Sequence, residues 1–297
     1  MKKPSPIRPR LAEGIERTVL LIDYSNLIYR AYFGSIKSWE VRPWLPIMRF
    51  IDSLRVCIQR LHVDGVRMEV IFAGESRQKL DRTNMDTSYK SQRVPVQHDI
   101  FRKFRKIMAL VIKDMGTTIM SRDGAEADDV IASVASYICD RENSKTEVVV
   151  FSNDRDLNQL LRFDNCYIYR SPGIFYTKEN FIDEFGFHPS KFEIYKAMVG
   201  DKSDNIKGIN GFGPVKATNY ILNNIIPIDE PDFIKSLKLV SLDCTLDVPI
   251  EGSVLLIDDE LTYSKIDIFQ AYGSNEKSRA FMEIQLALKM LGSVYER

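Results

Sequence analysis

The chain has 297 residues, of which 44% are hydrophobic and 28% charged, and its 41 basic and 41 acidic side chains cancel. This composition is ordinary for one large or two modest globular domains, and it argues against an intrinsically disordered or fibrous chain. The sequence has no apolar run of the roughly 18 residues that a membrane span needs, no signal-peptide core at its start, and four cysteines without a C-x-x-C pair. We therefore expect a cytoplasmic protein with free thiols, in which local rather than net charge would reveal a nucleic-acid partner.

The first predicted strand ends in an acid. Thr18–Ile22 is a short run of β-branched and leucine residues that leads directly into Asp23. Binding sites in open α/β sheets form beyond the carboxyl ends of the strands, so Asp23 lies where a ligand-holding residue is expected. The alternative is that Asp23 or Ser25 caps the helix that follows.

The second predicted strand, Met68–Phe72, leads toward Glu75 and then into a strongly basic segment. Within residues 77–106, nine lysines and arginines outnumber three acids. Few of these residues are apolar, so we expect a mobile excursion over the domain whose natural partner is a polyanion. A solvated loop without a ligand is the alternative, although a tyrosine beside basic residues offers base stacking together with phosphate contacts (Tyr89, Lys90 and Arg93).

A dense acidic group, formed by Glu126, Asp128 and Asp129, coincides with the start of an apolar pattern typical of a helix over residues 127–141. Carboxylates this close repel one another, so they must stay in solvent, raise some of their pKa values or hold a cation. We favour the cation. The alternative is that the acids only complement the positive N-terminal end of the helix.

Two acid pairs and a glycine-rich turn follow. Asp154 and Asp156 come just after the buried strand predicted at Glu147–Phe151, and Asp201 and Asp204 come just after a predicted helix. Beyond them, closely spaced glycines precede another helix, where backbone N–H groups can approach a phosphate and a lysine adds charge. These residues are Gly208, Gly211, Gly213 and Lys216. An ordinary turn between two helices is the alternative.

The acids at strand ends and in these groups share one chemistry, because no histidine or cysteine is among them. They are Asp23, Glu75, Glu126, Asp128, Asp129, Asp154, Asp156, Asp201 and Asp204. Ligation by oxygen alone favours hard cations such as Mg²⁺ or Mn²⁺. Two such ions can bind a scissile phosphodiester, activate a water and stabilise the leaving oxygen. The residues therefore predict metal-dependent phosphoryl chemistry on a polyanion.

Five stretches resemble, in the same order, the 5′-nuclease motifs of bacterial DNA polymerase I and of the bacteriophage flap endonucleases. They are residues 21–33 (LIDYSNLIYRAYF), 89–95 (YKSQRVP), 124–131 (GAEADDVI), 152–160 (SNDRDLNQL) and 199–217. Since no polymerase segment accompanies them, we expect a free-standing enzyme of the phage type.

The resemblance implies an α/β fold with a PIN-like, mainly parallel sheet flanked by helices and a helical arch over the active site. It also implies a helix-three-turn-helix (a helix-hairpin-helix type of motif) that grips duplex DNA and often holds a monovalent cation such as K⁺. We expect a flexible basic tail at 1–16, a nuclease domain at 17–190 with its arch at about 77–106, and a mostly helical DNA-binding region at 191–297.

The resemblance also implies roles for individual residues. One Mg²⁺ ion, replaceable by Mn²⁺, would be held directly or through water by Asp23, Glu75, Glu126, Asp128 and Asp129. A second ion would be served by Asp154, Asp156, Asp201 and Asp204. Lys90 and Arg93 would contact the scissile phosphate. Tyr29, Arg30 and Tyr89 would handle the displaced strand or terminal base. Gly208, Gly211, Gly213 and Lys216 would lie on the duplex-binding turn.

The chain departs from the family pattern after its second strand, where the family has an aspartate directly after the strand. Counting from the strand puts Ala73 in that place, whereas counting back from Tyr89 favours Glu75. We prefer Glu75, because its longer side chain can recover the reach.

The expected function is a Mg²⁺-dependent 5′ to 3′ exonuclease and flap endonuclease that leaves a 5′-phosphate. Its substrates would be branched or nicked duplex DNA and RNA/DNA hybrids in replication or repair, and it would act as a monomer beside replication proteins, in the host cytoplasm if a phage encodes it. One alternative is a structure-specific DNA-binding protein whose nuclease has decayed. An aspartyl phosphatase would want a second acid two residues after Asp23, where Ser25 stands.

Overall fold

The computed structural model of the chain describes residues 14–35, 45–76, 78–93, 99–141, 145–248, 250 and 253–257. Parts of four expectations lie outside these residues. They are most of the basic tail, positions 77 and 94–98 of the arch, and everything beyond 257, including a final helix expected at about 278–291.

A mixed, mostly parallel sheet forms the centre of the molecule, as expected. Within the described residues its strand order is β3-β2-β1-β4-β5-β6, and β7 pairs with β2. The strands β1 to β5 run parallel, whereas β6 and β7 are antiparallel to their neighbours. The bounds are β1 (Arg17–Asp23), β2 (Arg67–Ala73), β3 (Ile119–Met120), β4 (Thr146–Phe151), β5 (Cys166–Arg170), β6 (Ile174–Tyr176) and β7 (Val254–Ile257).

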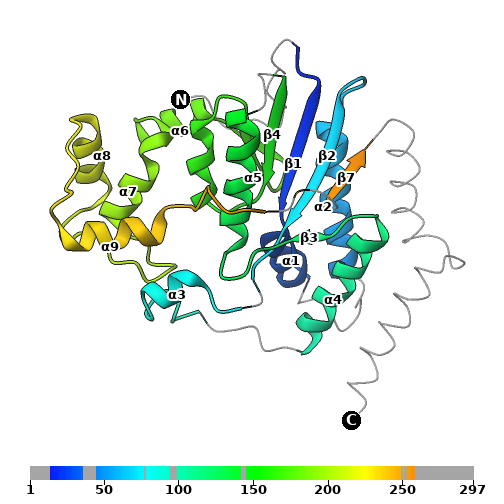
Figure 1. Cartoon of the computed structure of the whole chain (residues 1–297), viewed down its shortest axis with the longest axis horizontal. Coiled ribbons are helices and arrows are strands. Elements are labelled where there is room, and N and C mark those ends of the chain that lie inside the picture. The colour runs from blue at the N-terminus through cyan, green and yellow to red at the C-terminus, as the bar shows by residue number, and fades with distance from the viewer. Residues whose placement is uncertain are drawn as a thin grey trace, which may run out of the picture.

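Helices cover both faces of the sheet, which explains why its central strands are almost continuously apolar. On β1, Leu20 and Ile22 pack with the helices of one face, while Val19 and Leu21 belong to the core of the other face. This alternation follows the two-residue period of a strand. The first face carries α1 (Tyr24–Phe33), α2 (Leu45–Leu61) and α4 (Asp99–Asp114). The short helix α3 (Asp81–Met85) lies below α9 in Figure 1.

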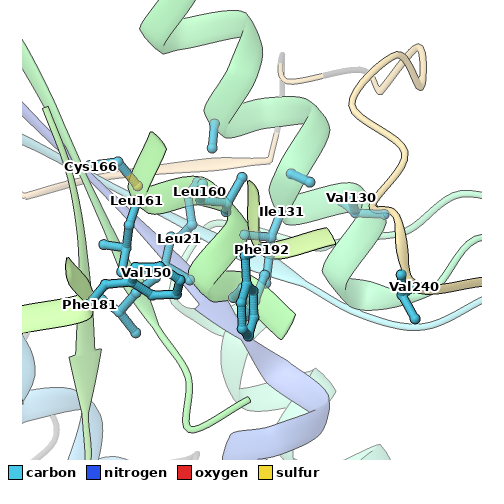
Figure 2. Close-up of a cluster of buried hydrophobic side chains, with 14 of the residues drawn as sticks. Leu21, Val130, Ile131, Val150, Leu160, Leu161, Cys166, Phe181, Phe192 and Val240 are labelled. Carbon is cyan, nitrogen blue, oxygen red and sulfur yellow. The ribbon is translucent and has the colours of Figure 1, made fainter. Parts of the chain in front are cut away.

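The second face is covered by α5 and by the helices of the C-terminal half (Figure 1). Figure 2 shows Leu21 of β1, Ile131 of α5, Phe192 of α7 and Val240 of α9 in one apolar cluster. The helical region expected from residue 191 onward therefore shares its core with the sheet. The bounds are α5 (Ala127–Arg141), the 3-10 segment η2 (Asp156–Arg162), α6 (Lys178–Phe185), the 3-10 turn η3 (Pro189–Lys191), α7 (Phe192–Val199), α8 (Pro214–Leu222) and α9 (Pro231–Val240).

After α9, residues 241–248 run back across α5; we call them the return segment. The Ser133 hydroxyl of α5 donates to the carbonyl of Asp243 at 2.8 Å and accepts from the Leu246 N–H at 3.2 Å. The Gln159 side chain donates to the carbonyl of Val240 at 2.9 Å. The return segment is thus fixed to the nuclease half by polar groups buried between the two.

No helix among the described residues is both long and apolar enough to cross a membrane.

Candidate active site

Asp23 ends β1 and caps α1, the role expected from the sequence as the alternative to holding a cation. Its Oδ1 accepts a hydrogen bond from the Asn26 N–H at 2.9 Å, so it caps the helix, while Oδ2 accepts from the Ser152 hydroxyl at 2.7 Å. Burial, together with the charges of Asp154 and Glu75, raises the pKa of Asp23 to about 6. The capping carboxylate therefore lies close to the negative charges of Asp154 and Glu75.

Asp128, in the first turn of α5, is at the centre of this negative charge. Its pKa is raised well above the usual range by burial and by the charges of Asp154, Asp23 and Asp156, in that order. These acids come from the ends of β1 and β4 and from the start of α5, so the folded chain brings three separate motifs to one edge of the sheet. Burial and Asp154 also raise the pKa of Asp156 to about 6, against the opposing charge of Lys196.

A cleft of about 470 Å³ opens beside these acids. It is lined by both acid pairs and by three cationic side chains, namely Asp154, Asp156, Asp201, Asp204, Arg93, Arg155 and Lys196. The four acids expected to serve a second ion therefore line one cleft.

The basic residues predicted on the arch reach into the acids. The Lys90 amine pairs with Glu126 and lies 3.7 Å from Asp204, and the Arg93 guanidinium pairs with Asp204. The Lys90 backbone has a φ of 54° and its N–H donates to the Asp204 carbonyl at 3.0 Å. This part of the arch is therefore anchored to the site by ion pairs and is not a solvated excursion.

Tyr89 differs from the role expected for it. Its ring is only 4% exposed, and its hydroxyl donates to Glu126 at 2.9 Å and lies 3.3 Å from an Asp204 oxygen. A buried ring cannot stack on a base. Tyr29 is the aromatic residue better placed to stack on a base, because it is 39% exposed. Burial raises the pKa of Tyr29, and the charge of nearby Glu75 raises it further.

Glu75 is exposed, and it lies near enough to Asp23 and Tyr29 for its charge to affect both. Ala73, the other candidate for this position, is buried at the end of β2 and has no ligating group.

Arg30 places its guanidinium over the Phe151 ring at 5.6 Å, and it lies close enough to Asp23 for the carboxylate charge to act on its pKa.

Two buried basic side chains, Lys196 and Arg82, were not anticipated from the sequence. The Lys196 amine of α7 is bound by Asp156 and, at 2.6 Å, by Asp201, so it bridges the two acid pairs. Burial lowers the pKa of Lys196, but these two carboxylates outweigh it and the net pKa is raised. Arg82 of α3 binds Glu126 at 2.9 Å and Asp129 at 2.6 Å. Lys196 is the single basic residue of the largely apolar helix α7, and this was the signal that could have identified it.

The glycine-rich turn precedes α8 as expected. Gly208 and Gly211 have φ values of 67° and 76°, which favour glycine. A Cβ on Gly208 would lie 2.4 Å from the backbone nitrogen of Gly200, so two backbone segments touch here. Gly213 is the N-cap of α8, and Lys216 in the first turn lies over the Phe212 ring at 3.9 Å.

The donor chemistry of the site fits divalent cations. All candidate donors are carboxylates, and the raised pKa values of Asp23, Asp128 and Asp156 are what a cation at this edge would relieve. As the side chains stand, no three ligand-type residues within the described part of the chain lie close enough together to hold a metal ion. Amines and guanidinium groups neutralise several of the carboxylates instead, as the ion pairs above show.

A mainly parallel α/β sheet with carboxylates and basic side chains at one edge defines a phosphoryl-transferring enzyme that acts on a polyanion. The comparison with known proteins gives the family. The model of the 5′-3′ exonuclease N-terminal resolvase-like domain matches residues 18–186, and this chain belongs to the 5′-3′ exonuclease family.

Several relatives and solved structures are similar to the chain. It is 29% identical to a 5′-3′ exonuclease of Aquifex aeolicus over 81% of this chain and 87% of the relative, and 31% identical to one of Mycoplasma genitalium over 69% and 72%. It is 30% identical to the thermostable DNA polymerase I of Thermus thermophilus over 68% of this chain but 24% of the polymerase. A crystal structure of a bacteriophage T5 flap endonuclease with DNA and metal ions has the same fold, with a TM-score of 0.59, 17% identity, and coverage of 86% of this chain and 98% of that one.

Proposed function

We propose that this member of the 5′-3′ exonuclease family is a Mg²⁺-dependent nuclease that removes nucleotides from 5′ ends and cleaves 5′ flaps. The observation that carries the proposal is the convergence of Asp23, Asp128 and Asp154 at the sheet edge, beside the cleft that holds the other acids. Burial and the charges of carboxylates from distant motifs raise the pKa values of Asp23 and Asp128 here, and such an arrangement is typical of a functional site rather than of a stable core.

Two groups of residues would hold the cations. One ion would lie among Asp23, Asp128 and Glu126, with Glu75 near it; a second would be served by Asp154, Asp156, Asp201 and Asp204. Cations held there supply an activated water and neutralise the charge that develops on the phosphate and the leaving oxygen. Mn²⁺ prefers the same oxygen donors and should replace Mg²⁺.

Lys90 and Arg93 would act on the scissile phosphate. Both are now paired with carboxylates that we assign to the cations. When cations occupy those carboxylates, the two basic side chains lose their partners and become free to donate to phosphate oxygens. Tyr29 and Arg30 would receive the terminal base at the other side of Asp23.

The region from residue 191 would bind the duplex. Support comes from the open N-terminus of α8, where no side chain caps the helix and Lys216 adds a positive charge. We propose branched or nicked DNA and RNA/DNA hybrids as substrates, with K⁺ as an additional ion at the turn between Gly208 and Gly213. The bacteriophage T5 flap endonuclease was solved with DNA and metal ions, which supports this assignment.

A cleavage assay tests the proposal. The full chain is incubated with 5′-flap, nicked and RNA-primed duplexes, in Mg²⁺ and in EDTA. We expect cleavage in Mg²⁺ with a 5′-phosphate product, and Asp154→Ala should lower the rate at least about 100-fold, because it removes a charge from the cation site. Asp164→Ala is the matched control, since the Asp164 side chain is 86% exposed and pairs with Lys178 away from the cleft.

The outcome decides between the two interpretations of the acid cluster. Cleavage that survives both EDTA and Asp154→Ala would contradict the proposed chemistry. Tight binding of forked DNA without any turnover in Mg²⁺ or Mn²⁺ would instead indicate a DNA-binding protein whose nuclease has decayed.

A further inference from the structure

Asp129 differs from the neighbouring acids in what its carboxylate contacts. Both of its oxygens accept from the Arg82 guanidinium at 2.6 Å. Oδ1 also accepts from the Asp243 backbone N–H at 3.0 Å, and Oδ2 from the Glu126 backbone N–H at 3.2 Å. A carboxylate offers about four lone-pair sites. Asp129, which is 4% exposed, therefore has its full set of hydrogen-bond donors within the protein.

Asp128, the next residue, has the opposite surroundings. It is partly exposed, and the charges that act on it belong to the carboxylates of Asp154, Asp23 and Asp156. Consecutive residues of a helix point about 100° apart. One acid of the pair therefore faces the cation site, and the other faces α3 and the return segment.

Arg82 connects three separate parts of the chain at this point. Besides the two bonds to Asp129, it donates to the Glu126 carboxylate at 2.9 Å and to the backbone carbonyl of Ser241 at 2.7 Å. One guanidinium thus joins α3, the first turn of α5 and the return segment that follows α9. The paired geometry of an Arg-carboxylate fork is specific as well as strong.

We propose that Asp129 is a positioning residue and not a cation ligand, and that with Arg82 it fastens the return segment to the acid-bearing turn of α5. The fastening links the DNA-binding half to the acid-bearing edge of the sheet. The statement that Asp129 is not a cation ligand rests on the proposed function. The statement that it fastens the return segment rests on the contacts alone.

Two measurements on the metal-free full chain test the proposal. The first is Mn²⁺ affinity by calorimetric titration of Asp128→Asn and Asp129→Asn without DNA. The second is hydrogen exchange of backbone amides in the return segment. We expect Asp128→Asn to lower the affinity at least about 10-fold, because a ligand charge is lost, and to leave exchange unchanged. Asp129→Asn should change the affinity less than about 3-fold and speed exchange at Asp243 and Leu246 about 10-fold, as expected for the loss of a charge-assisted hydrogen bond.

The thermal stability of the metal-free variants gives a third comparison. Asp128→Asn should raise the melting temperature, because it removes a charge from a crowded acidic group, whereas Asp129→Asn should lower it, because Arg82 loses its buried partner. If Asp129→Asn does not fold, Arg82→Lys replaces it: the charge stays, the fork is lost, and exchange in the return segment should rise at unchanged Mn²⁺ affinity.

Asp129 is a ligand, and the proposal is overturned, if Asp129→Asn loses as much Mn²⁺ affinity as Asp128→Asn. The proposal is also overturned if exchange in the return segment stays at the wild-type rate in both Asp129→Asn and Arg82→Lys. A wild-type chain that binds no Mn²⁺ would instead contradict the proposed function, and the exchange measurement would still test the fastening.

Discussion

A single residue at the site, Asp23, carries a cost in stability that a bound cation would offset. Asp23 caps α1 and is almost fully buried. This burial, together with the charges of neighbouring carboxylates, raises its pKa to about 6. The folded chain therefore keeps this proton up to about pH 6, whereas an unfolded chain releases it near pH 4. Between these values the folded state binds more protons, so the free energy of unfolding falls as the pH rises.

Asp23→Asn should remove this cost. Asparagine caps helices about as well as aspartate, so we expect the metal-free variant to be more stable at pH 7 by about 1 to 3 kcal/mol, since one pKa unit corresponds to about 1.4 kcal/mol. Part of the pH dependence between about pH 4 and 6 should disappear with it. Urea unfolding in EDTA at several pH values measures both effects. A variant no more stable than wild type at pH 7 would show that Asp23 carries no such cost.

The sequence was sufficient to place Asp23, Asp128 and Asp154 near one another, because strand ends and helix starts are local patterns and parallel strands end at one edge. It was not sufficient for Arg82 and Lys196. Arg82 lies 47 residues from Asp129, and Lys196 lies 40 residues from Asp156. A basic residue on its own gives no sign of which distant carboxylate will bury it, so Arg82 looked like part of a solvated basic segment.

Among the elements, the strongly apolar strands β1, β2 and β4 lie within one or two residues of their expected bounds. Two elements differ. The three-residue strand β6 pairs with β5 after a turn, and so short a strand has too little alternation to detect. The helix α4 begins at Asp99, within the segment expected to be a mobile excursion, because Phe101, Phe104 and Met108 form an apolar stripe among the basic residues.

The basic face of α4 should bind a single strand. Arg105 and Lys106 are exposed on this helix, and the Tyr24 hydroxyl of α1 donates to the Arg105 carbonyl at 2.9 Å. We expect the double variant Arg105→Gln/Lys106→Gln to bind 5′-flap DNA more weakly in EDTA. The slope of log K against log [KCl] should become shallower by about 1.4, or about 0.7 for each lost phosphate contact.

Lys113→Gln is the matched control on the same helix. Lys113 is exposed in the last turn of α4, away from the start of the helix. For this variant, the slope of log K against log [KCl] should equal that of the wild type. An equal loss in both variants would mean that α4 attracts DNA only through its general charge.

On the scale of the whole molecule, the two expected regions share one core. Phe233 of α9 is 2% exposed and packs in the cluster that contains Leu21 of β1 and Ile131 of α5. A boundary at residue 190 therefore separates functions better than it separates folding units. We expect the described parts of both regions to unfold together.

Phe233→Ala tests this expectation. It should lower the free energy of unfolding by about 3 to 5 kcal/mol, since a buried phenylalanine is lost, and amides of β4 should exchange faster although they lie in the other region. Ile234→Ala is the control; Ile234 is 44% exposed, and its loss should cost less than about 1 kcal/mol. Separate transitions for helices and sheet would contradict a shared core.

The pairing of β2 has a consequence for solubility. β2 is nearly all apolar, and the side of it that faces away from β1 is shared by two partners: β3 pairs with Phe72 and Ala73, and β7 pairs with Met68 through Ile71. Unpaired strand edges are templates on which a second molecule can add a strand. By returning to β2 after the helices, β7 pairs with four residues of that edge, and the edge of the described sheet passes to β7 itself. Because β7 has four residues, it offers a second molecule a much shorter template than β2 would.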